Sequence, residues 1–525
     1  MKKLNAYDLL TCGVIGLFTI ITLIRFDIYP VFVDIYYHLS VAVSFENAGG
    51  IVLWDFWEFA PVGRPHLYPP LLHSLMLLGS ECVPSLTVAK VVSFIMFPAS
   101  QVTLWIFSRE IYSRKTGFYA VLLLSSSEQY FQLQAVTSAA ALVLVLLPLL
   151  FLAFQKNKYI ASIILLTACL YTHVGMGPIA LFSFALYTVS RKKWEDGLKI
   201  IIPSLLLFIP WGLHLLIHNE SLSANSPPSG GGLMIFLWIL GIIGVYFSLK
   251  RKKEFLIPIC ILICMIPIAF TYLGRFTGHA ILPLAMLSGI TLSRIDDSLN
   301  RNQKIGWVLA SLLIFSIIAP TIALPRQQRT MPLPQNNPIR LPIQQLRENR
   351  EPPTQNPQSQ NPQLPPAGKN PPNRPIQPSR RLQLPSLLLM LPRRRSDSYL
   401  TPDNLKMAEI IKNNSTEAEI VFIPGGMMGC FVTATTGRPQ TFGMWQEVSS
   451  DYQPDPKSAA LFVTSKEMQV PRELIPLGET QRWAVYRAPF RKTVDIPAPT
   501  INKYLIYVLL FIALMGLLYD GMVKR

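Results

Sequence analysis

Long apolar runs recur along most of the chain, separated by short polar stretches. Twelve of them are long enough, or nearly so, to cross a bilayer of roughly 30 Å: residues 9–24, 88–107, 117–131, 135–154, 159–173, 175–190, 198–217, 233–249, 255–272, 277–293, 306–324 and 504–520. No small-residue cleavage site follows the first run, so we expect an uncleaved first span and not a signal peptide. The pattern predicts an all-α polytopic membrane bundle of about 12 transmembrane helices.

Basic residues between the apolar runs predict the orientation of the bundle. With the N-terminus in the cytoplasm, most Lys and Arg residues fall in the short inner segments, where membrane proteins collect them. The outer loops before residue 325 hold only Arg25, Arg64, Lys90 and Arg275. Both termini are therefore predicted to be cytoplasmic, and two long segments, residues 25–86 and 325–502, are predicted to face outward.

The chain divides into four predicted parts. Residues 1–324 form the transmembrane module, with residues 25–86 as its first outer loop, and residues 504–520 form the final helix. Residues 325–400 are rich in Pro, Gln and Arg and cannot bury enough surface to fold, so they are predicted to be a disordered linker.

Residues 401–495 have a globular composition. They predict a small extracytoplasmic α/β domain with a helix at 404–412, strands at 419–423, 461–464 and 483–486, and a Gly-rich turn at 424–426.

Composition narrows the function classes. Half of the residues are hydrophobic and 15% are charged, which is incompatible with a soluble protein of this length. The net charge of +17 would suggest nucleic acid in a soluble chain, but here the basic residues lie in clusters between apolar runs. We therefore expect membrane lipid as a partner and no nucleic acid.

The first outer loop contains the strongest candidates for chemistry. If Asp34 opens a helix, Asp34 and His38 lie four residues apart on one helix face. Such a pair can accept a proton or bind a metal ion. The alternative interpretation is an N-cap aspartate and an interfacial histidine. We predict that Asp34 and His38 are catalytic, with Asp34 also a candidate metal ligand.

Arg275 is the basic residue of another outer loop, in the segment Tyr272-Leu-Gly-Arg-Phe-Thr-Gly-His279. A guanidinium group offers two parallel hydrogen bonds and stays charged, which suits a phosphate group. The alternative is an arginine that extends to the membrane interface. Arg275 and His279 are the predicted contacts of a donor phosphate.

Other polar residues of the outer loops are weaker candidates for lining a cavity together with Asp34, His38 and Arg275. Each is, taken alone, typical of a polar residue at a membrane boundary. They are Asp55, Glu58, Arg64, His66, Glu128 and His173.

The first loop resembles that of a known family. The segments Asp34-Ile-Tyr-Tyr-His-Leu, Trp54-Asp and Tyr68-Pro-Pro-Leu look like the first outer loop of the GT-C glycosyltransferases, especially archaeal and bacterial relatives of the oligosaccharyltransferase catalytic subunit. Thr436-Gly-Arg and Gly443-Met-Trp-Gln-Glu-Val look similar to the outer domain of archaeal members. The resemblance implies a prokaryotic cell membrane enzyme, with Asp34 in the active site beside the acceptor and a metal, Mg²⁺ or Mn²⁺.

The sequence departs from the oligosaccharyltransferases themselves. The loop that carries their second acidic motif has no paired aspartates here, and the Trp-Trp-Asp-Tyr-Gly motif is missing. We therefore predict a glycosyltransferase that moves a sugar from a polyprenyl phosphate donor to a glycan, lipid or protein acceptor. The alternatives are a transporter or lipid flippase, or a GT-C relative without catalysis.

Overall fold

The structure, a computed structural model, describes residues 4–24, 26–30, 33–136, 138–221, 234–250, 253–271, 273–322, 399–443, 456–466, 470, 473–489 and 492–522. The predicted linker at residues 325–400 lies outside this range except for its last two residues, and so does most of the segment Gly443-Met-Trp-Gln-Glu-Val. Both of those predictions stay untested.

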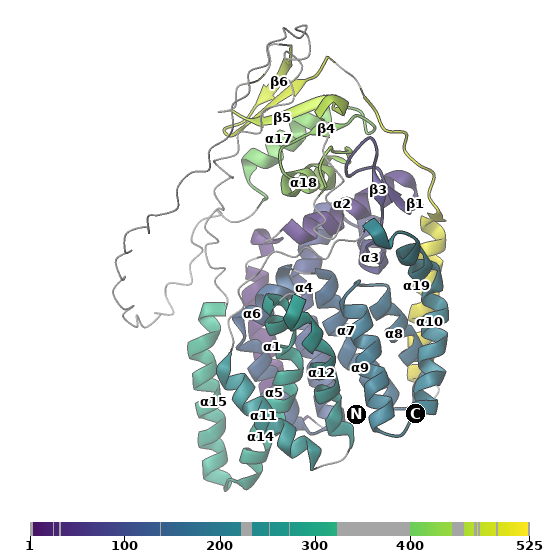
Figure 1. Cartoon of the computed structure of the whole chain (residues 1–525). Helices are drawn as coiled ribbons and strands as arrows, with labels where there is room; N and C mark the ends of the chain where they lie inside the picture. Colours follow the sequence, from purple (N-terminus) through teal and green to yellow (C-terminus); the bar gives the residue numbers. More distant parts are fainter. Residues whose placement is uncertain are drawn as a thin grey trace, which may run out of the picture. The chain divides into compact units, whose positions relative to one another are not determined.

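Helices dominate the chain and run side by side below the α/β unit of residues 399–502, which we call the outer unit (Figure 1). They are α1 (Ala6–Ile24), α4 (Ser85–Ile111), α5 (Arg114–Ser125), α6 (Glu128–Val136), α7 (Ser138–Gln155), α8 (Tyr159–Leu170), α9 (Met176–Ser190), α10 (Trp194–Ile217), α11 (Ile235–Leu249), α12 (Ile257–Thr271), α13 (Leu273–His279), α14 (Ile281–Ser298), α15 (Arg301–Ile322) and α19 (Lys503–Met522). Each of the 12 predicted apolar segments overlaps one of these helices.

Within the described part of the chain, five spans are long and apolar enough to cross a membrane: Ala6–Ile24, Ser85–Ile111, Trp194–Ile217, Leu273–Ser298 and Lys503–Asp520. The chain is therefore a multi-pass membrane protein. The larger number of crossings and the cytoplasmic position of both termini stay predictions.

The helices differ in how deeply they lie in the bundle. Residues 276–293 are all buried, and α14 packs against α5 and α11. Gly244 of α11 allows this approach, because a Cβ atom there would lie 2.2 Å from the carbonyl oxygen of Leu287. In contrast, α10 and α19 expose rows of Leu and Ile residues, as helices that face lipid do.

The segment at residues 117–131, predicted as one span, is two helices. Helix α5 ends at Ser125, and its 12 residues rise about 18 Å, which is short for a crossing. The side chains of Ser125 and Ser126 donate to the carbonyl oxygens of Val121 and Leu123. The hydroxyl of Ser127 then accepts from the backbone N–H of Tyr130, as a helix-capping serine does, and α6 begins.

The first outer loop has its own small architecture. It contains α2 (Val33–Ala48), β1 (Gly50–Ile51), β2 (Trp54–Asp55), β3 (Arg64–Pro65) and α3 (Leu71–Ser80). Strands β2 and β3 form an antiparallel hairpin. Gly63 enters β3 with φ +69°, and a Cβ atom there would lie 2.5 Å from the carbonyl oxygen of Asp55. Only glycine fits this turn without strain.

Residues 399–502 contain an α/β unit. Its elements are α17 (Pro402–Asn413), β4 (Val421–Phe422), α18 (Gly426–Thr436), β5 (Leu461–Ser465), β6 (Ile475–Glu479) and β7 (Trp483–Arg487). The sheet order is β4-β5-β7-β6, with β4 parallel to β5 and the other pairs antiparallel. The predicted helix and strands of this unit each overlap an observed element.

The Gly-rich segment at residues 424–426 was predicted to be only a turn, and this is wrong at its last residue. Gly425 does turn, with φ +95°, but Gly426 begins α18. Cys430 and Phe431 on this helix are fully buried, and α18 packs against α2. Burial of that face outweighs the low helix propensity of two glycines.

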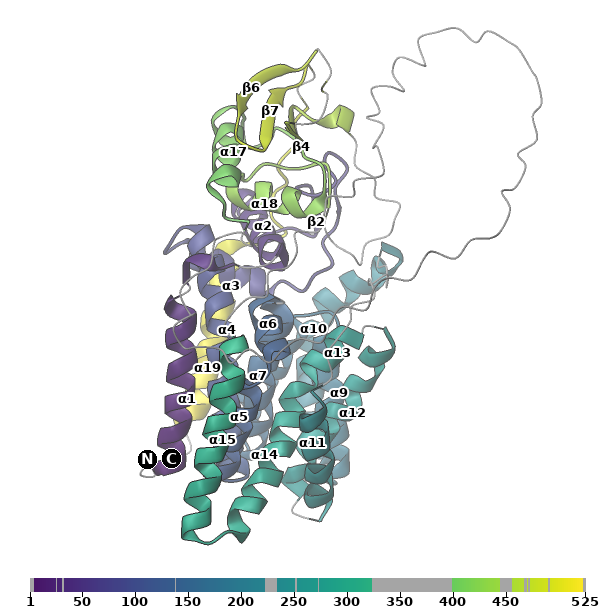
Figure 2. The same cartoon turned by 90° about the vertical axis from the view of Figure 1, so that its left-hand side faces the viewer.

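The outer unit contacts the first loop, and α18 lies beside α2 in Figure 2. The carbonyl oxygen of Gly437, just after α18, accepts from Asn47 Nδ2 at 3.0 Å and from Trp57 Nε1 at 3.1 Å. Strand β1 pairs with β8 (Ile501–Asn502), which leads into α19. Helix α2 is therefore fixed by contacts from both sides.

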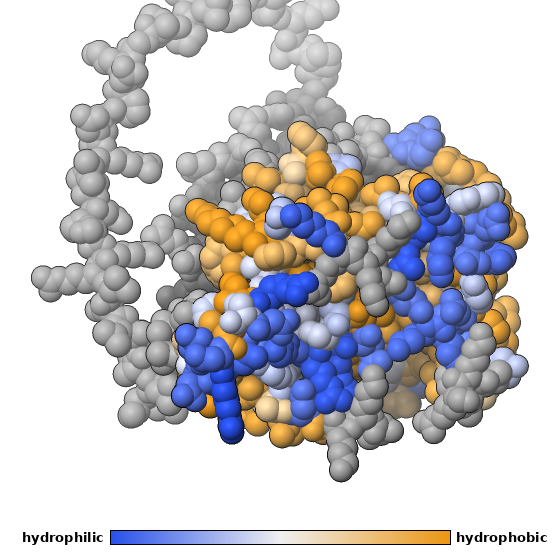
Figure 3. All heavy atoms as spheres, turned by 90° about the horizontal axis from the view of Figure 1, so that it is seen from below, coloured by the Kyte–Doolittle hydropathy of each residue, from blue (hydrophilic) through white to orange (hydrophobic). Residues whose placement is uncertain are grey.

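The far end of the bundle carries a separate polar cluster. Seen from below, hydrophilic side chains gather across this end and hydrophobic ones surround them (Figure 3). The buried carboxylate of Asp8 lies 3.3 Å from Nε of Arg109 and 3.4 Å from Nε of Arg114. Asp296 pairs with Lys115 at 2.6 Å. These ion pairs join α1, α4, α5 and α14 at one end.

Candidate functional site

Asp34 and Arg275 meet although 240 residues separate them in sequence. Asp34 lies in the first turn of α2, so it does open a helix as predicted. Arg275 lies on the short helix α13, and its Nη2 is 3.7 Å from Oδ2 of Asp34. The two side chains are 21% and 32% exposed, so both remain within reach of a ligand.

The surroundings of Asp34 make it a stronger base than an exposed aspartate. Burial raises the pKa of Asp34 above its ordinary value, and the positive charge of Arg275 acts against this increase. A carboxylate with a raised pKa accepts a proton more readily at neutral pH. The arrangement therefore suits proton transfer at Asp34.

His38 lies behind this pair and is tied to the loop. It follows Asp34 by one helical turn and is almost fully buried. Its Nδ1 is 2.9 Å from Nε2 of His73 on α3, so one of the two rings donates to the other. Burial, helped by the charge of Arg275, lowers the pKa of His38 to about 3. His38 is thus a neutral ring at physiological pH.

His173 belongs to the same neighbourhood. The ring of Tyr68 lies between two imidazoles, with its centroid 5.7 Å from that of His173 and 5.0 Å from that of His38. The backbone N–H groups of Gly175 and Met176 donate to Nδ1 of His173. His173 therefore caps the start of α9.

His279 shares α13 with Arg275, four residues later, so the two can lie on one helix face. Its side chain is buried, and its Nδ1 has no hydrogen-bond partner among the residues that the structure describes.

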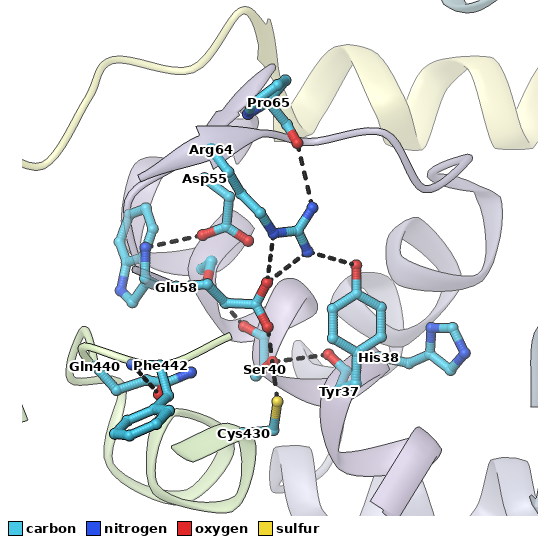
Figure 4. A network of polar contacts seen from close by, with 12 residues as sticks. Tyr37, His38, Ser40, Asp55, Glu58, Arg64, Pro65, Cys430, Gln440 and Phe442 are labelled. Carbon is cyan, nitrogen blue, oxygen red and sulfur yellow. Dashed lines mark hydrogen bonds and ion pairs between the residues drawn. The ribbon is translucent and has the colours of Figure 1, made fainter. Parts of the chain in front are cut away.

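Glu58 and Arg64 form a second carboxylate and guanidinium pair, shown in Figure 4. Nε of Arg64 donates to Oε2 of Glu58 at 2.7 Å, and the Arg64 guanidinium also bonds Glu58 through Nη2. Nη1 of Arg64 donates to the Pro65 carbonyl, and Nη2 lies 3.3 Å from the Tyr37 hydroxyl. Both charged side chains are at most 3% exposed, so this pair stabilises the loop from inside.

Asp55 and Cys430 complete this buried network. The backbone N–H of Trp57 donates to Asp55 at 2.8 Å, and the Cys430 thiol lies 3.7 Å from Oε1 of Glu58. Burial, helped by the neighbouring Glu58 carboxylate and opposed by Arg64, raises the pKa of Asp55 to about 7. Cys430 comes from α18, so the network also joins the loop to the outer unit (Figure 4).

His66 is enclosed among other rings. It is fully buried, and neither ring nitrogen has a partner within the described part of the chain. Its ring lies 5.5 Å from that of His73 and 5.8 Å from that of Trp211, centroid to centroid. Of the predicted cavity residues, Asp55, Glu58, Arg64 and His66 are therefore buried in the loop, whereas His173 is partly exposed and is linked to His38 through the ring of Tyr68.

The side chain of Glu128 lies outside the described residues, so its predicted role is untested. Its neighbour Gln129 does reach α13, because its Nε2 donates to the carbonyl oxygen of Gly274 at 3.2 Å and to the Thr277 hydroxyl. The beginning of α6 is thus attached to the helix that carries Arg275.

Sequence reasoning missed His73 and Tyr68 as neighbours of the site. Both lie in the segment Gly63-Arg-Pro-His-Leu-Tyr-Pro-Pro-Leu-Leu-His73, where their high density of ring side chains was the available signal. Only the fold of α3 against α2 shows that His73 bonds His38.

The expected divalent metal does not fit the residues present. Among the described residues, no group of three or more His, Cys, Asp or Glu side chains is placed to hold a metal ion. Asp34 has a guanidinium beside it, which is an unfavourable neighbour for a cation. We derive no step through a metal.

Two known structures of ArnT have a fold similar to that of this chain. ArnT from Cupriavidus metallidurans in the apo state matches with TM-score 0.52 and 12% identity, over 90% of this chain and 98% of that one. ArnT bound to undecaprenyl phosphate matches with TM-score 0.51 and 12% identity, over 93% and 99%. This chain therefore shares the fold of ArnT.

Structures of an archaeal oligosaccharyltransferase match the fold of this chain more weakly. The Archaeoglobus fulgidus oligosaccharyltransferase in its apo form has TM-score 0.48 and 13% identity, over 87% of this chain and 70% of that one. No protein-family model and no curated protein sequence matches the chain. The likeness to ArnT therefore shows the fold, in agreement with the expectation from the first loop, and the activity has to be argued from the site.

Proposed function

We propose that this chain is a GT-C-type membrane glycosyltransferase that moves a sugar from a polyprenyl phosphate donor to an acceptor on the extracytoplasmic side. The observation that carries the proposal is the accessible pair of Asp34 and Arg275 on a fold shared with ArnT. ArnT has been crystallised with undecaprenyl phosphate, which is the lipid carrier of the proposed donor class without its sugar.

The pair supplies the two groups that such a transfer needs. The Asp34 carboxylate takes the proton from the acceptor, whose freed electron pair attacks the anomeric carbon of the sugar. The bond from that carbon to the phosphate oxygen breaks, and its electrons stay on the phosphate. The Arg275 guanidinium stabilises this negative charge. The products are the glycosylated acceptor and the polyprenyl phosphate.

The membrane explains the rest of the architecture. A polyprenyl phosphate sugar has a long apolar tail and a charged head, so its transferase must hold the tail among apolar helices and the head at their polar ends. Arg275 lies on α13, directly before α14, and residues 281–293 of α14 are all buried in the bundle. The guanidinium is therefore fixed at the end of a helix that cannot shift without repacking its neighbours.

The test is sugar transfer by the purified full chain in lipid nanodiscs with radiolabelled polyprenyl phosphate sugars. Asp34→Asn removes the base but keeps the shape of the side chain, and Arg275→Gln removes the positive charge. Asp27→Asn is the matched control, because Asp27 lies in the same loop with a side chain that is 93% exposed. We expect transfer by the native chain and the control, and loss in the other two variants.

Equal transfer by all four proteins would contradict the assignment of the site. No transfer with any donor, together with movement of lipid or solute across vesicles, would support the transporter or flippase instead. No transfer and no movement, with lipid still bound, would indicate a relative without catalysis.

A further inference from the structure

The backbone determines which nitrogen of His173 carries the proton. The N–H groups of Gly175 and Met176 donate to Nδ1 at 2.9 and 3.1 Å. A nitrogen that accepts hydrogen bonds cannot hold the proton, so the neutral ring holds it on Nε2. Protonation of Nδ1 would also leave two N–H groups at the start of α9 without their acceptor. His173 is therefore a donor through Nε2.

The Nε2 atom of His173 is accessible. It makes no hydrogen bond to the residues that the structure describes, and it is not enclosed, because the side chain is only partly buried. In contrast, both nitrogens of His66 and Nδ1 of His73 are buried without partners. The chain thus presents the N–H of His173, and not those other nitrogens, to a ligand.

The position of His173 directs this donor to the proposed phosphate site. Through the ring of Tyr68 it is linked to His38, one turn after Asp34. Burial, and after it the positive charge of Arg275, lowers the pKa of His173 well below its ordinary value. The ring contacts through Tyr68 and His38 therefore place His173 on the side of the loop that carries the Asp34 and Arg275 pair.

A neutral donor beside an arginine has a physical advantage. A second positive charge there would be repelled by Arg275, whereas a neutral N–H adds a directed hydrogen bond without that repulsion. Helix N-termini favour the neutral imidazole in the same way. Arg275 then contributes positive charge to the site, and His173 contributes a directed hydrogen bond.

We propose that His173 donates a hydrogen bond from Nε2 to a phosphate oxygen of the polyprenyl phosphate, next to the Arg275 guanidinium; this rests on the function proposed above. His173 would be a contact of the phosphate shared by the donor and the released lipid. It takes no proton during the reaction, since Nδ1 is occupied by the backbone.

Two substitutions separate the donor from the helix cap. In His173→Asn, the side-chain oxygen can replace Nδ1 as the cap, and the Nε2 donor is lost. In His173→Gln, the amide nitrogen can reach the place of Nε2, and the cap is lost. The probes are undecaprenyl phosphate and undecaprenol, which lacks the phosphate, bound to the full chain in nanodiscs, with melting temperature measured in parallel.

We expect His173→Asn to bind undecaprenyl phosphate about tenfold to a hundredfold more weakly, as for the loss of one hydrogen bond to a charged acceptor. Binding of undecaprenol should not change. His173→Gln should keep most of the phosphate affinity and melt at a lower temperature than the native chain.

Native affinity for undecaprenyl phosphate in His173→Asn would overturn the inference, and so would an equal loss for both lipids. A greater loss of phosphate affinity in His173→Gln than in His173→Asn would also overturn it. If the native chain itself binds no undecaprenyl phosphate and transfers no sugar, the proposed function fails as well. Transfer by the native chain with unchanged binding in His173→Asn would refute only the role of His173.

Discussion

The first outer loop takes part in two carboxylate and arginine pairs of opposite character. Asp34 and Arg275 are 3.7 Å apart and partly exposed, and they join two elements far apart in sequence. Glu58 and Arg64 are six residues apart, in direct contact and buried. A carboxylate and arginine pair can therefore bind a ligand in one place and stabilise the fold in the other.

Burial accounts for the difference. A buried ion pair has lost its water, so each partner depends on the other and on nearby polar groups such as the Tyr37 hydroxyl. A partly exposed pair at 3.7 Å is weaker, because water competes with it. A phosphate group can then interact with the guanidinium of the exposed pair at little cost to the fold.

The largest expected effect is on catalysis at the exposed pair. Asp34→Asn should lower kcat about 10²–10⁴-fold, as for loss of a general base, with little change in melting temperature. Steady-state kinetics and thermal unfolding of the same preparation measure both quantities. A strong loss of thermal stability with normal kcat would reverse the roles that we give to the two pairs.

Substitutions in the buried pair should change the stability of the folded protein. Glu58→Gln leaves the Arg64 charge buried without its carboxylate, which should destabilise the protein by about 3–5 kcal/mol. Thermal unfolding followed by tryptophan fluorescence measures the change. A double substitution, Glu58→Met with Arg64→Met, removes both charges and should recover much of the loss; no recovery would mean that the two residues do not act as a pair.

Asp55 should make stability depend on pH through the buried network. Its pKa is about 7 in the folded protein and near its ordinary value when unfolded, so the folded state holds the proton more tightly. The resulting stabilisation is complete below about pH 4 and is lost as pH rises to about 7.

Asp55→Asn should therefore be more stable than the native chain at pH 8, by about 2–4 kcal/mol, and similar to it at pH 4. Melting temperatures across this pH range measure the difference. A constant difference at every pH would show that Asp55 does not titrate in the network.

The smallest effect concerns how the outer unit holds α2. Asn47→Ala removes the hydrogen bond to the Gly437 carbonyl and should cost about 1 kcal/mol, seen as a slightly lower melting temperature. We expect kcat to stay close to native, since the second bond from Trp57 remains. A tenfold loss of kcat would indicate that the outer unit positions Asp34 as well as supporting the loop.

Much of this protein follows from the order of its residues. Apolar runs of helical length predicted the helices, and serine residues after such a run, Ser125 to Ser127, could also have predicted the break that the structure shows there. Asp34 at the start of a helix, with His38 one turn later, follows from local sequence as well. These features depend on neighbours along the chain, so local rules describe them.

Tertiary structure alone decided which polar residues meet. The predicted outer loops before residue 325 hold three arginines, and nothing local indicates that Arg275 lies beside Asp34 while Arg64 is buried on Glu58. The same holds for His38 and His73, and for α18 against α2. Burial and the distance between remote side chains arise only when helices pack, and these two quantities separate a binding group from a structural one.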